Sequence, residues 1–297
     1  MSYHKKETFG DMDVLLYDRG FKSEEIKELI EKLNPGEINR TPNSNVYSFD
    51  YKNLQIDLIF VKPENWDASK IFFQWGDLGN LMGKIFNSYG GKIENYIFKY
   101  GYDGIKVKLL YETNKKVVYL SKDNSIMFDL LGLDFERFKK GFNDQYEMFD
   151  YVMESKFFSY DVFQWENLSS INKQRNKKRP GFHEFLEYIE SEKHRVIEWI
   201  QSEDYFIDKL NDLFEVNLQE EMKELKDRID RRKALRSKFS GKTIMEEFNI
   251  SGKELGSKME FFRKYIEECY PYGSYEEYIE KCDVNVILWH FKEINKL

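Results

Sequence analysis

Two aspartates separated by one residue lie in the segment Gly10-Asp11-Met12-Asp13-Val14-Leu15-Leu16. The apolar residues after Asp13 predict a strand, and because side chains alternate along a strand, Asp11 and Asp13 point to the same side. Two carboxylates held together in this way repel each other unless a cation lies between them. The pair is therefore a candidate set of metal ligands, although an Asp-x-Asp sequence is also common in plain turns and helix caps.

A third aspartate, Asp57, lies inside the apolar strand candidate Gln55-Ile56-Asp57-Leu58-Ile59-Phe60. An ionised carboxylate in such a strand is unfavourable unless it is paired or bound to a metal. Three carboxylates on adjacent strands can hold two Mg²⁺ ions roughly 3.5–4 Å apart, the arrangement used for in-line phosphoryl transfer. In this scheme Asp11 and Asp13 bridge both ions, while Asp57 binds only the ion that activates a 3′-hydroxyl. The predicted catalytic and metal-binding residues are these three, with Mn²⁺ as an alternative ion.

The apolar patterns of the first third of the chain predict the elements that would position these residues. Alternation with period two indicates strands, and a rhythm of three to four residues indicates helices. The expected elements are a strand at 13–17, a helix at 23–33, a hairpin of strands 45–51 and 54–61, a helical stretch at 68–86 broken around Gly76, and a second hairpin of strands 105–110 and 116–120. This order predicts a small mixed sheet with helices on one face.

Strand patterns fade after residue 125, and the remaining chain predicts helices. These are expected over residues 183–203, 206–242, 244–248, 253–269 and 284–296. The fold prediction is therefore α+β, with a small mixed-sheet domain at 1–120, a helical connector at 121–180 and an all-helical C-terminal region at 181–297.

Three ordered segments resemble one known superfamily. The run Lys6-Glu7-Thr8-Phe9-Gly10-Asp11-Met12-Asp13-Val14-Leu15 resembles the catalytic signature of the X family of DNA polymerases, within the polymerase-beta nucleotidyltransferase superfamily. Gln55-Ile56-Asp57-Leu58 resembles its third-carboxylate strand. Fifteen residues beyond Asp57, Phe72-Phe73-Gln74-Trp75-Gly76-Asp77-Leu78-Gly79-Asn80 is similar to its nucleotide-binding segment. The resemblance implies that residues 1–120 form a nucleotidyltransferase palm domain.

The resemblance also implies roles for the nucleotide-binding segment. Phe72 and Phe73 would lie beside the sugar of an incoming nucleotide, Gly76 would form the turn, and Asp77 and Asn80 would lie near the base. Simple alternatives exist for both ends of the segment. The two phenylalanines could be core residues, and Asp77 could be the N-cap of the following helix.

The triphosphate-binding part of the family pattern is only partly matched. The family has a Gly-Ser pair about ten residues before its Asp-x-Asp, and alignment places Met1, or Ser2 after a shift of one residue, at the serine. The expected phosphate-side residues are Ser2, Lys5, Lys6 and Gly10, although lysines of this kind are often merely solvated. Motifs of the family's lyase domain and of its duplex-gripping hairpins are not found, which argues against template-directed gap filling.

A segment of the helical half resembles another branch of the same superfamily. Gly241 to Phe248, followed by Ile250-Ser251-Gly252-Lys253-Glu254-Leu255-Gly256, is similar to a helix–turn–helix of CCA-adding enzymes and bacterial poly(A) polymerases. The same glycines have a plain use as helix caps and packing points. The resemblance favours RNA over DNA as the acceptor.

Two basic stretches are the candidate contacts for a phosphate backbone. Charged helix faces are usually just solvated, but these stretches stand out against a net charge of −7, which excludes binding of long duplexes through bulk charge. The predicted nucleic-acid-binding residues are Lys173, Arg175, Lys177, Lys178 and Arg179 in the first stretch, and Arg228, Arg231, Arg232, Lys233 and Arg236 in the second.

Composition limits the class of protein further. The 297 residues are 41% hydrophobic and 17% aromatic, enough for a substantial core. Cys269 and Cys282 form no metal-ligand spacing, and no window is apolar enough for a membrane span, so a cytoplasmic protein is expected.

The function predicted from these patterns is nucleotidyl transfer. The chain is expected to add a nucleoside monophosphate from an NTP or dNTP to the 3′-hydroxyl of a nucleic acid, with an RNA or tRNA 3′ end favoured. Three alternatives stay open: a small X-family-like DNA polymerase, an enzyme that transfers a nucleotide to a small molecule or protein, and a nucleic-acid-binding protein with a degenerate catalytic domain.

Overall fold

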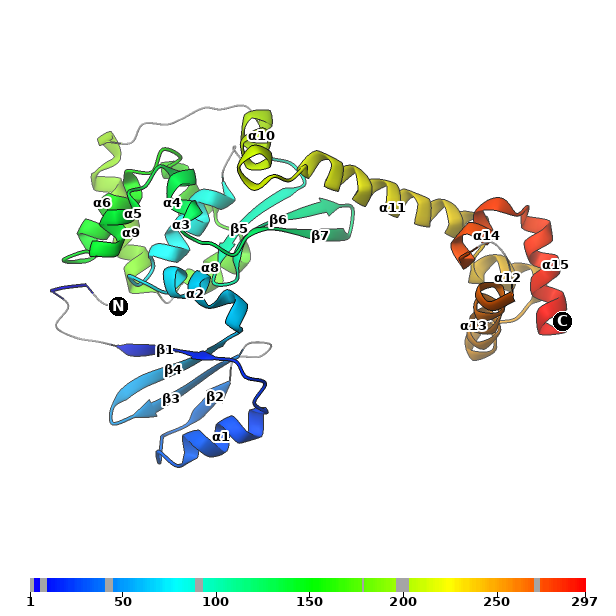
Figure 1. Cartoon of the computed structure of the whole chain (residues 1–297), viewed down its shortest axis with the longest axis horizontal. Coiled ribbons are helices and arrows are strands. Elements are labelled where there is room, and N and C mark those ends of the chain that lie inside the picture. The colour runs from blue at the N-terminus through cyan, green and yellow to red at the C-terminus, as the bar shows by residue number, and fades with distance from the viewer. Residues whose placement is uncertain are drawn as a thin grey trace. The chain divides into compact units, whose positions relative to one another are not determined.

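The computed structural model describes residues 3–5, 10–40, 45–88, 93–177, 179–195, 203–269 and 273–297. Two compact units are present, Met1–Leu218 and Gln219–Leu297 (Figure 1). The fold is α+β, as predicted, and every described element after Ser121 is helical. The expected boundaries at residues 120 and 180 both fall inside the first unit, so the three-part division stays a prediction.

The first sheet contains the predicted carboxylate strands. It consists of β1 (Asp11–Tyr17), β2 (Ile38–Arg40), β3 (Val46–Tyr51) and β4 (Leu54–Val61), in the order β1-β4-β3-β2. Strand β1 is parallel to β4, and the other pairs are antiparallel, so the sheet is mixed. At the tip of the β3–β4 hairpin, Lys52 and Asn53 have φ values of 50° and 66°, which suit a tight two-residue turn. The predicted hairpin is confirmed.

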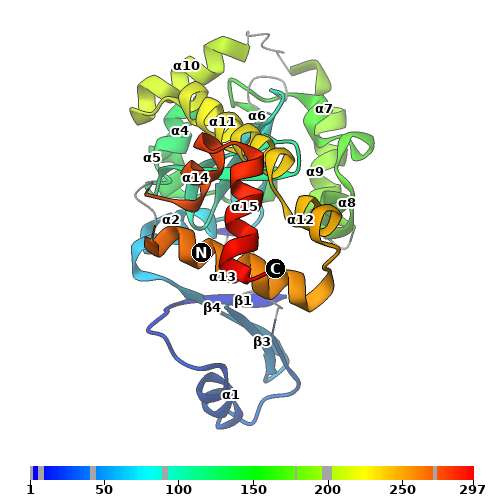
Figure 2. The ribbon, with the colours of Figure 1, turned by 90° about the vertical axis from the view of Figure 1, so that its right-hand side faces the viewer.

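One face of this sheet is covered by α1 (Ser23–Glu31), as Figures 1 and 2 show. Ile26 and Ile30 of α1 are buried in one cluster with Tyr47 and Phe49 of β3. Because Tyr47 and Phe49 pair with Leu58 and Ile56 of β4, the residues between them in sequence, including Asp57, face the opposite side of the sheet.

The second sheet is a separate, antiparallel one, which the sequence did not predict. It consists of β5 (Tyr96–Gly101), β6 (Gly104–Tyr111) and β7 (Asn114–Ser121), in that order. The expected second hairpin is β6–β7, but it pairs with β5 and not with the first sheet. Phe98 of β5 packs on Phe86 of helix α3 (Leu78–Asn87) with ring centroids 5.6 Å apart, so burial against this helix organises the second sheet.

Besides α1, the helices of the first unit lie both before and after the second sheet in the sequence. They are η1 (Pro63–Asn65), α2 (Trp66–Phe72), α3 (Leu78–Asn87), α4 (Ile126–Leu131), α5 (Phe135–Lys140), α6 (Gln145–Met153), α7 (Tyr160–Phe163), η2 (Trp165–Asn167), α8 (Ser170–Asn176), α9 (Pro180–Ser191), η3 (Lys193–Arg195) and α10 (Glu203–Phe214). Aromatic side chains dominate their packing: the rings of Phe149 and Phe185 lie 5.0 Å apart and those of Phe128 and Phe138 4.5 Å apart.

The second unit consists of helices around its own core. They are α11 (Leu218–Lys238, whose first residue belongs to the first unit), α12 (Gly241–Phe248), α13 (Gly252–Cys269), α14 (Tyr275–Lys281) and α15 (Val284–Asn295). Ile244, Phe262 and Phe291 are fully buried in this core. The helix expected over 206–242 is two helices, α10 and α11, because the chain turns at Glu215 with φ 51°.

Among the described helices, none combines the length and the apolar composition that crossing a membrane would require.

Candidate active site

The three predicted carboxylates lie on one face of the first sheet. In the parallel pairing of β1 with β4, Asp13 is opposite Asp57 and Asp11 is opposite Gln55. Directly paired residues of neighbouring strands point to the same face, and Asp11 precedes Asp13 by two residues, so all three side chains share this face. It is the face opposite α1, so the helix does not cover them.

The charges on this face influence one another. Partial burial, followed by the negative charges of Asp11 and Asp57, raises the pKa of the Asp13 carboxyl above its usual range. The Gln55 side chain donates a hydrogen bond from Nε2 to Oδ1 of Asp57 over 3.0 Å, which orients that carboxylate. The result is an acidic edge that a cation would stabilise.

The carboxylates share a face without converging on one point. In the described residues, no group of three or more His, Cys, Asp or Glu side chains is arranged to hold a metal ion. Carboxylate oxygens are the donors that Mg²⁺ uses in proteins, so the chemistry of the donor set fits the ion. Rotation of the exposed Asp11 and Asp13 side chains would be needed to bring their oxygens to a common ion.

A cavity of about 690 Å³ continues along the same face of β4. Ile59 and Val61, two and four residues beyond Asp57, form one wall. Phe73 and Tyr102 form part of the other wall, with their rings stacked at 6.1 Å and an interplanar angle of 20°. A volume of this size suits a mononucleotide. Phe73, predicted to lie beside the sugar, therefore borders a space next to the carboxylate face.

The turn between α2 and α3 has an unusual, firmly held backbone. Trp75 and Gly76 have φ values of 60° and 61°, so the predicted break around Gly76 is confirmed. The Trp75 side chain is buried and donates a hydrogen bond from Nε1 to the Phe138 carbonyl over 2.9 Å. Its ring lies so close to Gly141 that a Cβ there would be 2.2 Å from it. Packing of this indole against the C-terminal end of α5 fixes the turn.

Asp77 occupies the N-cap position of α3, but its side chain caps no backbone group of that helix. It accepts a hydrogen bond from Nη1 of Arg179 over 2.7 Å instead. Gly181 lies beside the pair, since a Cβ at this position would be 3.3 Å from Asp77 Oδ2. The structure thus joins a residue predicted to lie near a base with one predicted to contact nucleic acid, across 102 positions of sequence.

The described N-terminal residues lie against the same region. Tyr3 donates a hydrogen bond from its hydroxyl to the Trp75 carbonyl over 3.4 Å, and the Lys5 amide donates to the Asn143 carbonyl over 2.8 Å. The Lys5 residue is exposed, as is Gly10 at the start of β1. Ser2 and Lys6, the other expected phosphate-side residues, lie outside the described residues.

The first basic stretch does not form a single track. Lys173 donates a hydrogen bond to the Glu166 carbonyl over 3.1 Å, Arg175 lines a second cavity, and Arg179 is held by Asp77. Lys177 is exposed, and Lys178 lies outside the described residues. Part of this stretch is helical, because α8 extends to Asn176.

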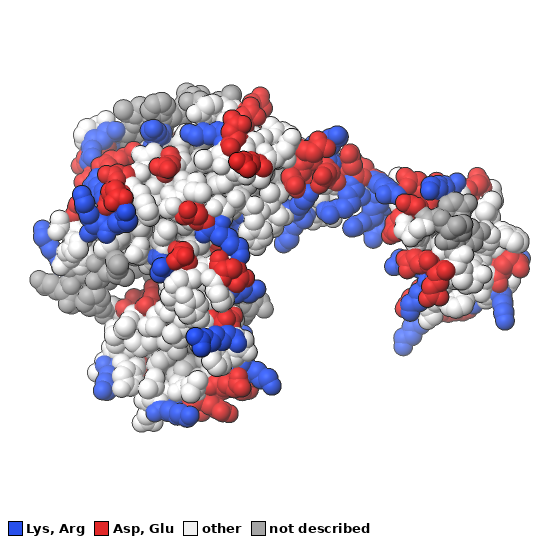
Figure 3. Space-filling view, in the orientation of Figure 1, with Lys and Arg blue, Asp and Glu red and all other residues white. Residues whose placement is uncertain are grey.

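The second basic stretch forms a row on α11. Arg228, Arg232 and Arg236 are four residues apart, so they share one side of the helix, and all three are exposed. Figure 3 shows Lys and Arg side chains gathered over α11. Arg231 is paired with Glu280 at 2.6 Å, so this charge is already engaged, and Lys233 is exposed.

Comparisons of the chain with protein-family models, with curated proteins and with solved structures gave no match. The assignment of a function therefore depends on the geometry of the described residues.

Two cationic residues near the predicted nucleotide segment were missed. Lys84 of α3 and Lys99 of β5 line the second cavity together with Phe72, Asn80 and Arg175. A signal for Lys84 existed in the sequence, because it falls among the buried positions of α3, next to Ile85 and three residues after Leu81. A lysine at an apolar position of an amphipathic helix is rarely accommodated without a partner.

Proposed function

We propose that this chain is a nucleotidyltransferase that adds a nucleoside monophosphate from an NTP or dNTP to the 3′-hydroxyl of a nucleic acid. The observation that carries the proposal is the register of β1 on β4, which pairs Asp13 with Asp57 and leaves Asp11 on the same face. Three carboxylates on one face of β1 and β4 repel one another, and a bound cation would relieve this repulsion.

In this proposal Asp11, Asp13 and Asp57 hold two Mg²⁺ ions, which Mn²⁺ can replace. Such ions lower the pKa of the attacking hydroxyl and balance the charge of the triphosphate. The 3′-oxygen forms a bond to the α-phosphorus, the bond from that phosphorus to the β-phosphate oxygen breaks, and pyrophosphate leaves. Asp57, which Gln55 orients through one oxygen, is the carboxylate assigned to the side of the hydroxyl.

The cavity beside Ile59 and Val61 supports the proposal because it can receive the nucleoside. The stacked rings of Phe73 and Tyr102 offer an apolar wall for a sugar or base. Lys62 and Lys122 are the cations of this cavity that phosphate oxygens would contact. Glu64 and Asp103 also line it, and Asp103 is paired with Lys106.

An RNA or tRNA 3′ end is the favoured acceptor. Two features support it: the resemblance of the sequence of residues 241–256 to a helix–turn–helix of CCA-adding enzymes and bacterial poly(A) polymerases, and the exposed row of Arg228, Arg232 and Arg236 on α11. A row of this kind binds phosphates without reading bases.

The test is incorporation of radiolabelled NTPs and dNTPs into tRNA, single-stranded RNA and primed DNA. Asp57→Asn should reduce incorporation at least 100-fold, because it removes a metal-binding charge and leaves the shape of the side chain. Asp67→Asn is the matched control, since Asp67 forms only an exposed ion pair with Lys70 and should retain full activity. Equal incorporation by Asp57→Asn and the unaltered chain would contradict the proposal. Incorporation into primed DNA alone would assign a DNA polymerase instead.

A second candidate function is nucleic-acid binding without catalysis. It is favoured by the lack of convergence of the three carboxylates among the described residues, together with the exposed arginine row. Under this alternative, RNA would be retained in a gel-shift assay while every NTP and dNTP failed to be incorporated.

A further inference from the structure

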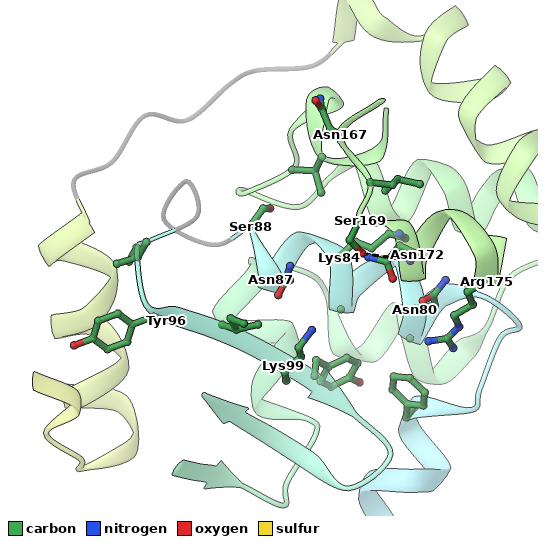
Figure 4. Close-up of a pocket in the computed structure, with 18 of the residues that line it drawn as sticks. Asn80, Lys84, Asn87, Ser88, Tyr96, Lys99, Asn167, Ser169, Asn172 and Arg175 are labelled. Carbon is green, nitrogen blue, oxygen red and sulfur yellow. Dashed lines mark hydrogen bonds between the residues drawn. The ribbon is translucent and has the colours of Figure 1, made fainter. Parts of the chain in front are cut away.

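A second cavity, of about 680 Å³, lies in the first unit between α3, β5 and the segment from α7 to α8. Figure 4 shows Lys84 of α3, Lys99 of β5 and Arg175 of α8 around it. No Asp or Glu is among its described lining residues, and Asp11, Asp13 and Asp57 do not border it. Among the described residues, three cations from three elements therefore surround a space that no carboxylate lines.

Lys84 carries the strongest indication of a missing anion. The residue is only 8% exposed, and its Nζ has no hydrogen-bond partner among the described residues. The Lys84 ammonium lies over the ring of Phe182, with Nζ 4.9 Å from the ring centroid. The acid that raises the pKa of Lys84 is Asp77, and this carboxylate is already paired with Arg179. A buried ammonium in this setting is unfavourable unless a ligand supplies negative charge.

Other buried polar atoms around the cavity also lack partners. The Asn80 amide nitrogen, the Asn87 amide oxygen and the Tyr100 hydroxyl have no hydrogen-bond partner among the described residues. Buried polar groups of folded proteins are nearly always hydrogen-bonded, so several orphans at one cavity indicate a polar ligand. These groups include both donors and acceptors, unlike the cations, which only donate.

We propose that this cavity binds a nucleoside phosphate, with the phosphate between Lys84, Lys99 and Arg175 and the base against the asparagine side chains. Inorganic phosphate would occupy only part of the volume and would leave the carboxamides unpaired. A carboxamide offers a donor and an acceptor side by side, which matches the edge of a base. Phe72 and Tyr100 supply the apolar part of the wall. Asp11, Asp13 and Asp57 do not line this cavity, so binding here can be measured apart from metal binding at the carboxylate face.

The test is equilibrium binding of AMP, ATP, GTP, CTP, UTP and inorganic phosphate to the full-length Asp57→Asn chain in EDTA. These conditions suppress metal-dependent binding at the carboxylate face. At least one nucleotide should bind saturably and more tightly than phosphate. Arg175→Gln should weaken that binding at least tenfold, whereas Lys115→Gln, which removes an exposed charge of β7 that does not line the cavity, should leave it unchanged.

A second variant separates ligand binding from a structural role of Lys84. Lys84→Met keeps the length of the side chain and removes the charge, so it should raise the Tm of the free protein and abolish the Tm increase caused by the nucleotide. A lower Tm with retained binding would show that Lys84 is structural and would overturn the proposal. Equal affinity for phosphate and all nucleotides, or binding unaffected by Arg175→Gln, would overturn it as well.

Discussion

The carboxylate face of the first sheet and the cavity beside β5 gather charge of opposite sign by different means. Asp11, Asp13 and Asp57 lie on an open face, where water still solvates the exposed members. Lys84 is enclosed by protein, and its ammonium group has no hydrogen-bond partner in the part of the chain that the structure describes. Like charges repel one another at both sites, but burial increases the repulsion energy only in the cavity beside β5. The comparison predicts that ligand removal affects activity most at the first site and folding stability most at the second.

The largest expected effect is on catalysis at the carboxylate face. Asp13→Asn should lower incorporation roughly 1,000-fold, equivalent to about 4 kcal/mol in the activation free energy, because Asp13 is the carboxylate closest to both others in the pairing. The same variant should raise the Tm in EDTA, since it relieves repulsion. A parallel loss of activity and of Tm would instead indicate a structural role for Asp13.

The pH dependence of stability should distinguish the buried cavity from the open face. Burial, then the charges of Arg175 and Arg179, lower the pKa of Lys84 to about 8; Asp77 raises it and Lys99 lowers it. Between pH 8 and 10.5 the unfolded chain therefore binds a proton that the folded chain lacks, and the free energy of unfolding rises with pH. The 2.5 units between the two pKa values set an upper limit of about 3.4 kcal/mol on this difference. Urea unfolding at several pH values should show this rise in the unaltered chain and not in Lys84→Met.

Deprotonation of Lys84 should have the opposite effect on nucleotide binding: the free energy of unfolding rises with pH, whereas the affinity for the nucleotide falls. Anion binding favours the charged form of Lys84, so nucleotide affinity should be highest below pH 8 and fall above it. Lys99, Arg175 and Arg179 remain the other cations facing Lys84, and Asp77 is the acid. Isothermal titration calorimetry from pH 6.5 to 9.5 is the measurement. Nucleotide affinity that is constant across this range would separate Lys84 from the ligand.

Metal binding at the carboxylate face should stabilise the folded protein by an amount similar to the effect of Lys84 titration, and this amount should depend on the metal concentration. Mg²⁺ at 100 times its Kd should increase the free energy of unfolding by about 2.7 kcal/mol. Asp13→Asn should remove most of this increase, whereas Lys84→Met should leave it unchanged. Calorimetric scans with and without Mg²⁺ provide the comparison. An increase of the same size in Asp13→Asn would assign the ion to another place.

The smallest expected effect concerns the arginine row of α11. Arg232→Gln should reduce the slope of log affinity for single-stranded RNA against log salt concentration by about 0.7, the value for one phosphate contact. Arg231→Gln is the matched control on the same helix, because Arg231 is already paired with Glu280. Fluorescence anisotropy at several salt concentrations measures both slopes. Identical slopes for the two variants would exclude Arg232 from the RNA surface.

Local patterns predicted much of the carboxylate face because its determinants are local. Alternation along β1 and the turn at Lys52-Asn53 define which residues share a face and how β3 joins β4. The pairing of Asp13 with Asp57 depends on the register of β1 against β4. In the sequence, only the resemblance of both segments to the superfamily's carboxylate strands indicated that the two residues are neighbours. Asp57 was placed correctly on a strand because its apolar neighbours required burial.

The second sheet and its cavity were not predicted, because their determinants are distant in sequence. Strand β5 is short, and it is stabilised by α3, which lies before it in the chain. Arg179 meets Asp77 across 102 positions, and Arg175 approaches Lys84 only after α8 has packed near α3. Hydrophobic periodicity indicates local secondary structure and does not predict long-range contacts of this kind. The one local signal was the lysine at a buried position of α3.

Helix α2 is attached to both sheets of the first unit. Ser69 of α2 donates a hydrogen bond to the Tyr102 carbonyl over 2.8 Å, and Asn124 donates to the Ala68 carbonyl over 2.8 Å; both polar side chains belong to buried residues. Helix α2 is thus fastened to the second sheet, while residues 62–65 connect it to β4. Trp66, the first residue of α2, also stacks on Tyr17 of β1 with ring centroids 4.1 Å apart, so this one short helix carries the spacing between Asp57 on the first sheet and Phe73 beside the second.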